Sequence, residues 1–271
     1  MLLPFIKMTY NQIFLDMRKN NIPLADIKVI FDGCFHVDFD RLGIIGEEEG
    51  PLEYPSILKK LMDGYPAYYL AGYIDILSLH IFLNEDTLIP RTETEDFIYT
   101  YLSSHHDLSG KKVLDLCTGS GFIALAIKKL YPESIVDASD ISENALKAAQ
   151  ESADYNQLKI HFIKSDFFND IQNVYDIIIC NPPYIEEGSK DVDAPFEPDL
   201  ALYSGKDGLD SYRSIFKELK KHLTKNGTAY FEMESTNVKN TISLLKKLIP
   251  EADYEVIEDC YQRQRYLKVS F

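Results

Sequence analysis

From residue 110 onward, short apolar runs alternate with stretches whose apolar residues recur at helical spacing, and this alternation restricts the fold most strongly. The strand-like runs are 112–116, 134–138, 160–163, 175–180, 228–233, 254–258 and 266–271. Helical patterns separate the first three runs and return around 209–223 and 242–248. Strands and helices that alternate at these lengths form βαβ units around a parallel sheet. The pattern therefore predicts an α/β domain.

The first 70 residues lack this alternation. Two short segments there carry apolar stripes at helical spacing, Ile13, Phe14 and Met17 in one and Ile57, Leu58, Leu61 and Met62 in the other. Such stripes are normally buried, so they predict the core of a small helical domain. Residues 73–77 and 79–83 then predict a β-hairpin around Ser78. The expected division is a helical domain over 1–70, a hairpin linker over 71–90 and the α/β domain over 91–271.

Composition bounds the class of protein. With 271 residues and 45% apolar content, the chain is an ordinary globular protein. No apolar run approaches the roughly 20 residues that span a bilayer, and the first residues lack the order of a signal peptide, so we expect no membrane association and a cytoplasmic location. Its four cysteines show no C-x-x-C pairing, which argues against a zinc site, and we expect no metal. The net charge of −15 repels phosphate backbones and argues against stable nucleic-acid binding.

The strand over 112–116 leads into a glycine-containing loop, 115–121, and then directly into a helix. Glycines at such a junction let a ligand approach the backbone, and 119–124 matches the dinucleotide-binding pattern G-x-G-x-x-A. Asp140 closes the next strand, where a carboxylate can accept hydrogen bonds from both ribose hydroxyls. Asp166 is expected to end the third strand within reach of an adenine amine, followed by Phe167 and Phe168 as possible stacking partners. The spacing predicts a bound nucleoside, and it fits a nicotinamide cofactor and S-adenosylmethionine equally.

The fourth strand, 175–180, ends in Asn181-Pro182-Pro183-Tyr184. Two prolines fix the direction of the strand exit, and this places Asn181 and Tyr184 relative to each other. The Asn181 side-chain oxygen and the Pro182 carbonyl can each accept one N–H of a planar NH2 group, on an amide or an adenine, and Tyr184 can stack on its plane. Hydride transfer has no use for this arrangement, whereas methyl transfer to such a nitrogen has, which favours S-adenosylmethionine.

Together these motifs resemble the release factor glutamine methyltransferases, the HemK or PrmC family. The resemblance covers nearly the whole chain from Pro66 onward. It rests on the segments 66–72, 88–95, 115–121, 165–167, 181–184, 197–202 and 207–213, together with Asp140. The Ile-Pro-Arg element before the cofactor loop and the Glu-Pro to Asp-Gly-Leu segment after Tyr184 are highly specific as a pair.

The resemblance implies a seven-stranded, mostly parallel Rossmann-like sheet with an antiparallel edge. It also implies transfer of a methyl group from S-adenosylmethionine to the side-chain amide of a glutamine in a peptide chain release factor, during translation termination. The cofactor contacts would be Cys117, Thr118, Gly119, Ser120, Gly121, Asp140, Phe167 and Asn181, with Asp166 added from its position. The glutamine would bind Asn181, Pro182, Pro183 and Tyr184, with Arg91, Glu93 and Glu95 walling the site. The helical domain would help to hold the protein substrate, and we expect a monomer.

This chain departs from the family pattern at several positions. Cys117 and Ser204 each stand where the family usually has glycine. Thr92 replaces a usual proline, and Tyr68 replaces a usual glutamine. The segment Glu232-Met233-Glu234 stands where the family commonly has Glu-Ile-Gly. A side chain at residue 117 fits readily only if the backbone φ there is negative. Three other interpretations stay open at this point: methylation of a ribosomal-protein glutamine, methylation of an adenine amine in nucleic acid, and a degenerate cofactor-binding protein without turnover.

Overall fold

The computed structural model describes residues 7–103, 107–189 and 194–271. The chain divides into two compact units, Met1–Ile74 and Asp75–Phe271. Residues 1–6, on which the signal-peptide expectation rested, lie outside the described residues. In the ranges that are described, no helix combines the length and the apolar character needed to cross a bilayer.

The first unit is helical. It comprises α1 (Tyr10–Lys19), α2 (Leu24–Val29), the π-helix η1 (Ile30–Cys34), the 3-10 helix η2 (Phe39–Arg41), α3 (Leu42–Ile45), α4 (Tyr54–Met62) and α5 (Ala67–Ala71). Thr9 begins α1 through a capping box with Gln12, which satisfies backbone N–H groups at the helix start. Ile13, Met17 and Leu61 are buried in the core of this unit, as their stripes predict. Met62, in contrast, is 59% exposed, so its assignment to the core was wrong.

A two-stranded hairpin follows, β1 (Tyr73–Ile76) and β2 (Leu79–Phe82). Leu77 and Ser78 between the strands both have positive φ, 54° and 58°, as a tight two-residue turn requires. The boundary between the two units falls inside β1. In the second unit, helix α9 (Glu143–Tyr155) holds the backbone of β2, because the Phe82 N–H donates to the Ser152 hydroxyl at 2.9 Å.

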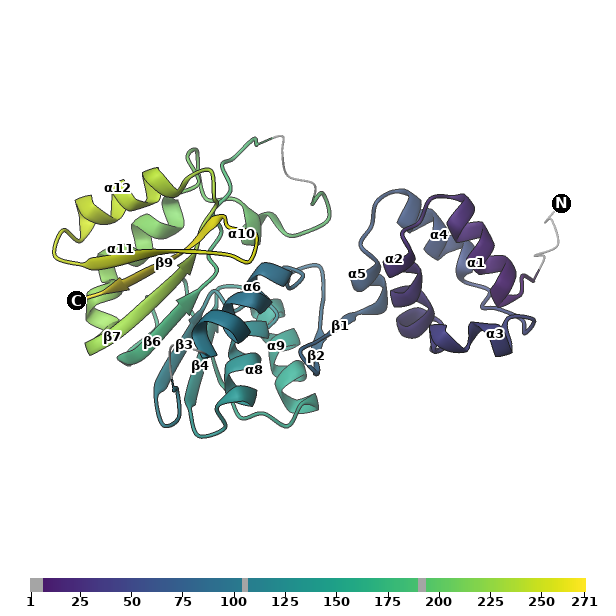
Figure 1. Ribbon diagram of the computed structural model, residues 1–271, viewed down its shortest axis with the longest axis horizontal. Helices are drawn as coiled ribbons and strands as arrows, with labels where there is room; N and C mark the ends of the chain where they lie inside the picture. Colours follow the sequence, from purple (N-terminus) through teal and green to yellow (C-terminus); the bar gives the residue numbers. More distant parts are fainter. Residues whose placement is uncertain (1–6, 104–106, 190–193) are drawn as a thin grey trace. The chain divides into compact units, whose positions relative to one another are not determined.

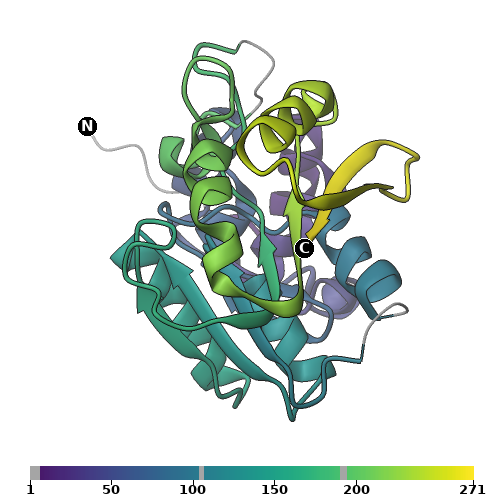
Figure 2. The same ribbon diagram turned by 90° about the vertical axis from the view of Figure 1, so that its left-hand side faces the viewer.

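Within the described residues, the second unit has a sheet of seven strands in the order β5-β4-β3-β6-β7-β9-β8. The strands are β3 (Lys112–Leu116), β4 (Ile135–Asp140), β5 (His161–Lys164), β6 (Tyr175–Cys180), β7 (Leu223–Glu232), β8 (Asp253–Glu258) and β9 (Gln264–Ser270). The pairs from β5 to β7 are parallel, and β9 runs antiparallel to both neighbours. This confirms the predicted fold class. In Figure 2 the antiparallel β8–β9 pair, in yellow, lies at one edge of the sheet.

Helices cover both faces of this sheet (Figure 1). One face carries α6 (Thr92–Asp96), the π-helix η3 (Phe97–Leu102), α8 (Phe122–Leu130) and α9. The other carries α11 (Asp210–His222) and α12 (Val238–Leu248), preceded by the short α10 (Asp199–Leu202). Ile215 and Leu219 of α11 and Leu245 of α12 share one buried core with Ile178 and Phe231 of the sheet.

Successive strands run outward from β3 to β5 on one side, and the chain then returns to place β6 on the other side of β3. The carboxyl ends of β3 and β6 are therefore the switch point of the sheet, where open α/β sheets bind their ligands. Leu116 pairs with Cys180 in register, so the loop that begins at Cys117 and the segment that begins at Asn181 leave the sheet side by side.

Candidate active site

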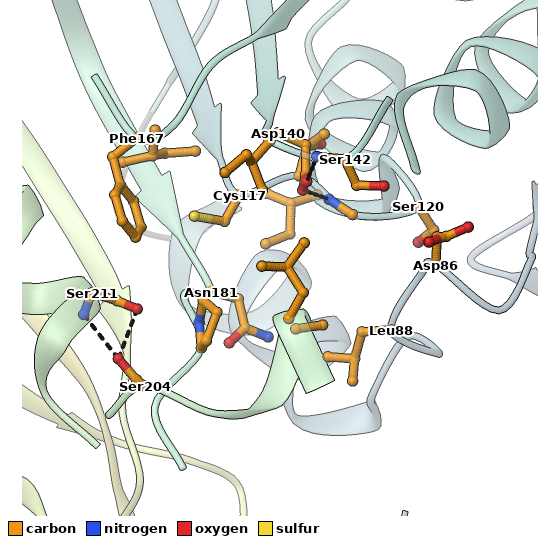
Figure 3. Close-up of a pocket in the computed structure, with 18 of the residues that line it drawn as sticks. Asp86, Leu88, Cys117, Ser120, Asp140, Ser142, Phe167, Asn181, Ser204 and Ser211 are labelled. Carbon is orange, nitrogen blue, oxygen red and sulfur yellow. Dashed lines mark hydrogen bonds between the residues drawn. The ribbon is translucent and has the colours of Figure 1, made fainter. Parts of the chain in front are cut away.

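A cavity of about 310 Å³ opens at this switch point. Its wall includes ten of the residues that the sequence analysis proposed: Arg91, Cys117, Thr118, Gly119, Ser120, Asp140, Asp166, Phe167, Asn181 and Pro183. In Figure 3, Asp140, Cys117 and Phe167 lie on one side of the cavity and Asn181 and Leu88 on the other. Gly121, Pro182 and Tyr184 are not part of its wall. The tertiary structure thus brings most of the proposed residues to one place.

Asp115, the fourth residue of β3, anchors the loop under this cavity. Its side chain is fully buried, and one carboxylate oxygen accepts hydrogen bonds from the Thr118 hydroxyl at 2.5 Å and from the Ala124 N–H at 3.0 Å. The other oxygen is buried with no hydrogen-bond partner in the described part of the chain. Burial raises the pKa of Asp115 to about 7, against the lowering effect of the two hydrogen bonds.

This raised pKa predicts a pH-dependent stability. The folded protein keeps the Asp115 proton up to about pH 7, whereas the unfolded chain releases it near its ordinary pKa of 3.8. The contribution of Asp115 to the free energy of unfolding is therefore fully present below pH 3.8. It decreases as pH rises toward 7, by at most about 1.4 kcal/mol per pH unit. Urea unfolding at pH 5 and pH 8 should show wild type losing stability relative to Asp115→Asn. A difference between the two proteins that stays constant with pH would contradict the assignment.

Three residues of the loop have positive φ: Cys117 at 64°, Gly119 at 54° and Gly121 at 83°. Because φ at Cys117 is positive, its side chain does not fit readily there. A side chain in this left-handed region of the backbone costs on the order of 1 kcal/mol. Its thiol contacts that of Cys180, which is buried. At Gly119 the space beside the backbone is open, so a ligand can approach the chain there. At Gly121 an added Cβ would meet Ala149 at 2.9 Å, so this glycine permits close packing between α8 and α9.

Asp140 ends β4 as predicted, and its carboxylate faces the cavity (Figure 3). One oxygen accepts the Gly119 N–H and the other accepts the Ser142 N–H, both at 2.9 Å. A carboxylate has about four lone-pair sites, so the two oxygens together can still accept from a further donor such as a ribose hydroxyl. Burial raises the pKa of Asp140, and these N–H groups oppose the shift. Asp166 does not end the third strand, because β5 ends at Lys164; that detail of the prediction was wrong.

A second cavity, of about 720 Å³, also has Asn181 in its wall. It shares Leu88, Arg91, Asn181 and Ala201 with the first cavity. The remainder of its described wall is Tyr184, Ile185, Glu186, Ser189, Ala194, Leu202, Lys206, Asp207, Glu234, Thr236, Asn237 and Asn240. Asn181 is therefore accessible from both cavities, an arrangement that allows it to contact two different ligands.

The segment that follows α10 holds the exit of β6 in place. The Ile185 N–H donates to the Leu202 carbonyl at 2.9 Å, and the Ser204 N–H donates back to the Ile185 carbonyl at 2.8 Å. The Ser204 hydroxyl accepts the Ser211 N–H at 2.8 Å near the start of α11 (Figure 3). Ser204, which departs from the family pattern, therefore has a hydrogen-bond partner in Ser211. Leu202 and Ser204 in turn hold Ile185, the residue that directly follows the Asn-Pro-Pro-Tyr exit.

Comparisons with known proteins agree with this geometry. The family model described as "Methyltransferase small domain" matches residues 96–196. The release factor glutamine methyltransferase of Streptococcus pneumoniae is 36% identical over 218 residues, 79% of this chain and 78% of that protein. This chain belongs to the release factor glutamine methyltransferase family.

Solved structures show the same fold at lower identity. The ribosomal protein L11 methylase of Lactobacillus delbrueckii subsp. bulgaricus has a TM-score of 0.52 at 20% identity, covering 70% of this chain and 84% of that one. The 16S rRNA N2 G1207 methyltransferase of Thermus thermophilus, solved in complex with AdoMet and guanosine, has a TM-score of 0.50 at 16% identity, covering 73% of this chain and 49% of that one. Both likenesses concern the methyltransferase fold alone.

In this member of the release factor glutamine methyltransferase family, the segment that was expected to wall the site contributes in part. Arg91 lines both cavities and forms an ion pair with Glu197, whose side chain is buried. Thr94 lines the first cavity, whereas Glu93 and Glu95 are absent from the described walls of both. On the short helix α6, Thr94 points inward and the neighbouring glutamates do not.

Sequence reasoning missed several residues of the first cavity. The most evident are Asp86, Ser142, Leu200 and Ser211. Asp86 and Ser142 lie two residues from Leu88 and Asp140, so polar residues that flank a motif carried a usable signal. Leu200 and Ser211 lie within segments that carry the resemblance, but only the packing of α10 and α11 shows that they reach the cavity.

Proposed function

We propose that this protein transfers a methyl group from S-adenosylmethionine to the side-chain amide nitrogen of a glutamine in a peptide chain release factor. The observation that carries the proposal is that Asn181 lines both a cavity suited to a nucleoside and a second, larger cavity. Family membership supplies the choice of protein substrate.

The residues of the first cavity suit the cofactor. The Asp140 carboxylate retains capacity to accept a hydrogen bond from a ribose hydroxyl, and the open space beside Gly119 admits a ligand to the backbone. Asp166 and Phe167 are the proposed adenine contacts. When bound, S-adenosylmethionine would supply an electrophilic methyl group on a sulfonium centre.

The residues of the strand exit then act on the acceptor. An amide nitrogen is a poor nucleophile because its lone pair is delocalised into the carbonyl group. Acceptance of its two N–H groups by the Asn181 side-chain oxygen and the Pro182 carbonyl would hold the nitrogen in line with the methyl group. The same two oxygens would favour the positive charge that develops there. The Tyr184 ring lines the second cavity, where it can lie against the glutamine side chain.

Three finer features belong to the proposal. The helical unit is taken to help hold the protein substrate, as the family resemblance implies, whereas the described walls of both cavities come from the second unit. The enzyme is taken to act as a cytoplasmic monomer. Stable nucleic-acid binding is not expected, since a net charge of −15 repels phosphate.

The test is radiolabelled methyl transfer from S-adenosylmethionine to purified release factor, ribosomal proteins and DNA in parallel, followed by mass spectrometry. We expect label on a glutamine of the release factor. Label on a ribosomal protein or on adenine would replace the proposed substrate. Cofactor binding without any label would indicate a degenerate binding protein.

Substitution of Asp140 tests the placement of the cofactor. Asp140→Ala removes both proposed ribose contacts and the acceptors of two loop N–H groups, so S-adenosylmethionine should bind roughly tenfold to a hundredfold more weakly. Asp140→Asn keeps one acceptor oxygen, so its affinity for S-adenosylmethionine should lie between those of Asp140→Ala and wild type. Calorimetry measures both affinities, and an unchanged affinity in Asp140→Ala would refute the placement.

A further inference from the structure

A buried carboxylate lies directly behind the acceptor side of the site. Glu232 is the last residue of β7 and is only 4% exposed. Phe231 pairs in register with Cys180, so Glu232 stands beside the start of the Asn181–Tyr184 exit. Its two oxygens have separate partners: the Tyr184 hydroxyl donates to one at 3.1 Å and the Thr94 hydroxyl donates to the other at 2.9 Å.

These partners belong to different walls of the site. Tyr184 lines the second cavity, and Thr94 lines the first. Glu232 itself is part of neither described wall, so it has no access to a ligand in either cavity. The Glu232 side chain therefore links Tyr184, in the wall of the second (acceptor) cavity, to Thr94, in the wall of the first (cofactor) cavity.

Three neighbouring groups partly offset the cost of burying Glu232. Burial raises its pKa, and the Thr94 hydroxyl, the Arg265 charge and the Tyr184 hydroxyl act in the opposite direction. Arg265 is itself buried and is oriented by an ion pair of 3.0 Å with Asp259. A carboxyl group removed from water at this position is costly unless its oxygens are hydrogen-bonded, and here each oxygen accepts one hydrogen bond.

The hydrogen bond also defines what Tyr184 can do. Its hydroxyl is donated to Glu232, away from the second cavity, which leaves the ring as the surface available to an acceptor. We propose that Glu232 is a positioning residue for methyl transfer: it fixes the Tyr184 ring against the acceptor and ties that ring to the cofactor wall through Thr94. The inference rests on the proposed function, since it names how the acceptor side of that site is kept in place.

Glu232→Met tests this role, because it keeps the length of the side chain and removes both hydrogen bonds. Misplacement of an acceptor by about 1 Å can cost roughly a hundredfold in rate. We expect kcat on release factor to fall roughly tenfold to a hundredfold, with the affinity for S-adenosylmethionine within about threefold of wild type. Glu232→Gln, which can still accept from Tyr184 and bond to Thr94, should restore most of kcat.

Three further variants separate positioning from general loss of structure. Tyr184→Phe should lower kcat. The double variant Tyr184→Phe/Glu232→Met should be no slower than the worse single variant, because both substitutions remove the same Tyr184–Glu232 hydrogen bond. The control is Tyr212→Phe: the buried Tyr212 hydroxyl donates to the Glu232 backbone carbonyl, so its loss disturbs the same residue without touching the carboxylate. This control should lower thermal stability and leave kcat near the wild-type value.

The outcomes are distinguishable. If wild type does not label release factor, the proposed function fails and this inference fails with it. If wild type is active and folded Glu232→Met keeps its kcat, the inference alone is overturned. Fully additive effects of Tyr184→Phe and Glu232→Met would also overturn it. If Glu232→Met does not fold, a Glu232→Gln variant with near wild-type kcat beside a slow Tyr184→Phe supports the inference, and a fully active Tyr184→Phe overturns it.

Discussion

Replacement of Asn181 by alanine is expected to lower methyl transfer to release factor by two or more orders of magnitude while S-adenosylmethionine still binds. The side-chain oxygen of Asn181 is the proposed acceptor for one N–H of the glutamine amide, and loss of one such preorganised group typically costs a hundredfold or more in rate. Single-turnover kinetics with calorimetry of cofactor binding provides the measurement. Near-normal turnover would remove Asn181 from the mechanism.

Asn240 provides the matched control for this experiment. It is also an asparagine of the second cavity, and its side chain donates to Asn237 at 2.8 Å. It is not part of the wall of the first cavity, so it cannot lie between cofactor and acceptor. Asn240→Ala should therefore change KM for release factor more than kcat, the reverse of the Asn181→Ala pattern.

Gly208→Ala is expected to disable the site without touching either cavity. Gly208 has a φ of 70°, and an added Cβ would press on the Tyr184 carbonyl oxygen and lie 3.2 Å from the Tyr184 carbonyl carbon. Backbone strain and the contact together should cost about 2 to 4 kcal/mol of unfolding free energy. Any relaxation must move the Asn181–Tyr184 exit, so kcat should fall as well. Urea unfolding and turnover of the folded fraction measure the two effects.

Gly110→Ala separates strain from contact. Gly110 has nearly the same φ, 71°, but an added Cβ would meet nothing within 4 Å. It should lose about 1 kcal/mol through backbone strain alone and retain its activity. Equal stability losses in the two variants would show that the backbone of Tyr184 is not packed against Gly208.

Much of the site followed from local sequence. The apolar runs predicted the strands of the sheet, and motifs that follow parallel strands must meet at the same edge, so the proximity of Cys117, Asp140 and Asn181 could be inferred. The loop 115–121 and the Asn-Pro-Pro-Tyr exit were recognisable because glycine and proline act on the backbone of their own residues.

The tertiary structure decided which side chains meet across distant segments. Glu232 joins Tyr184, 48 residues earlier, and Thr94, 138 residues earlier, and no periodicity links these positions. Likewise, the inward turn of Thr94 rather than Glu93 or Glu95 depends on how the short α6 packs on the sheet. Sequence by itself therefore determined the strand ends that carry the chemistry, because backbone preferences are local. Only the packed structure determined how those ends are held, because a buried hydrogen bond depends on where two distant segments come to rest.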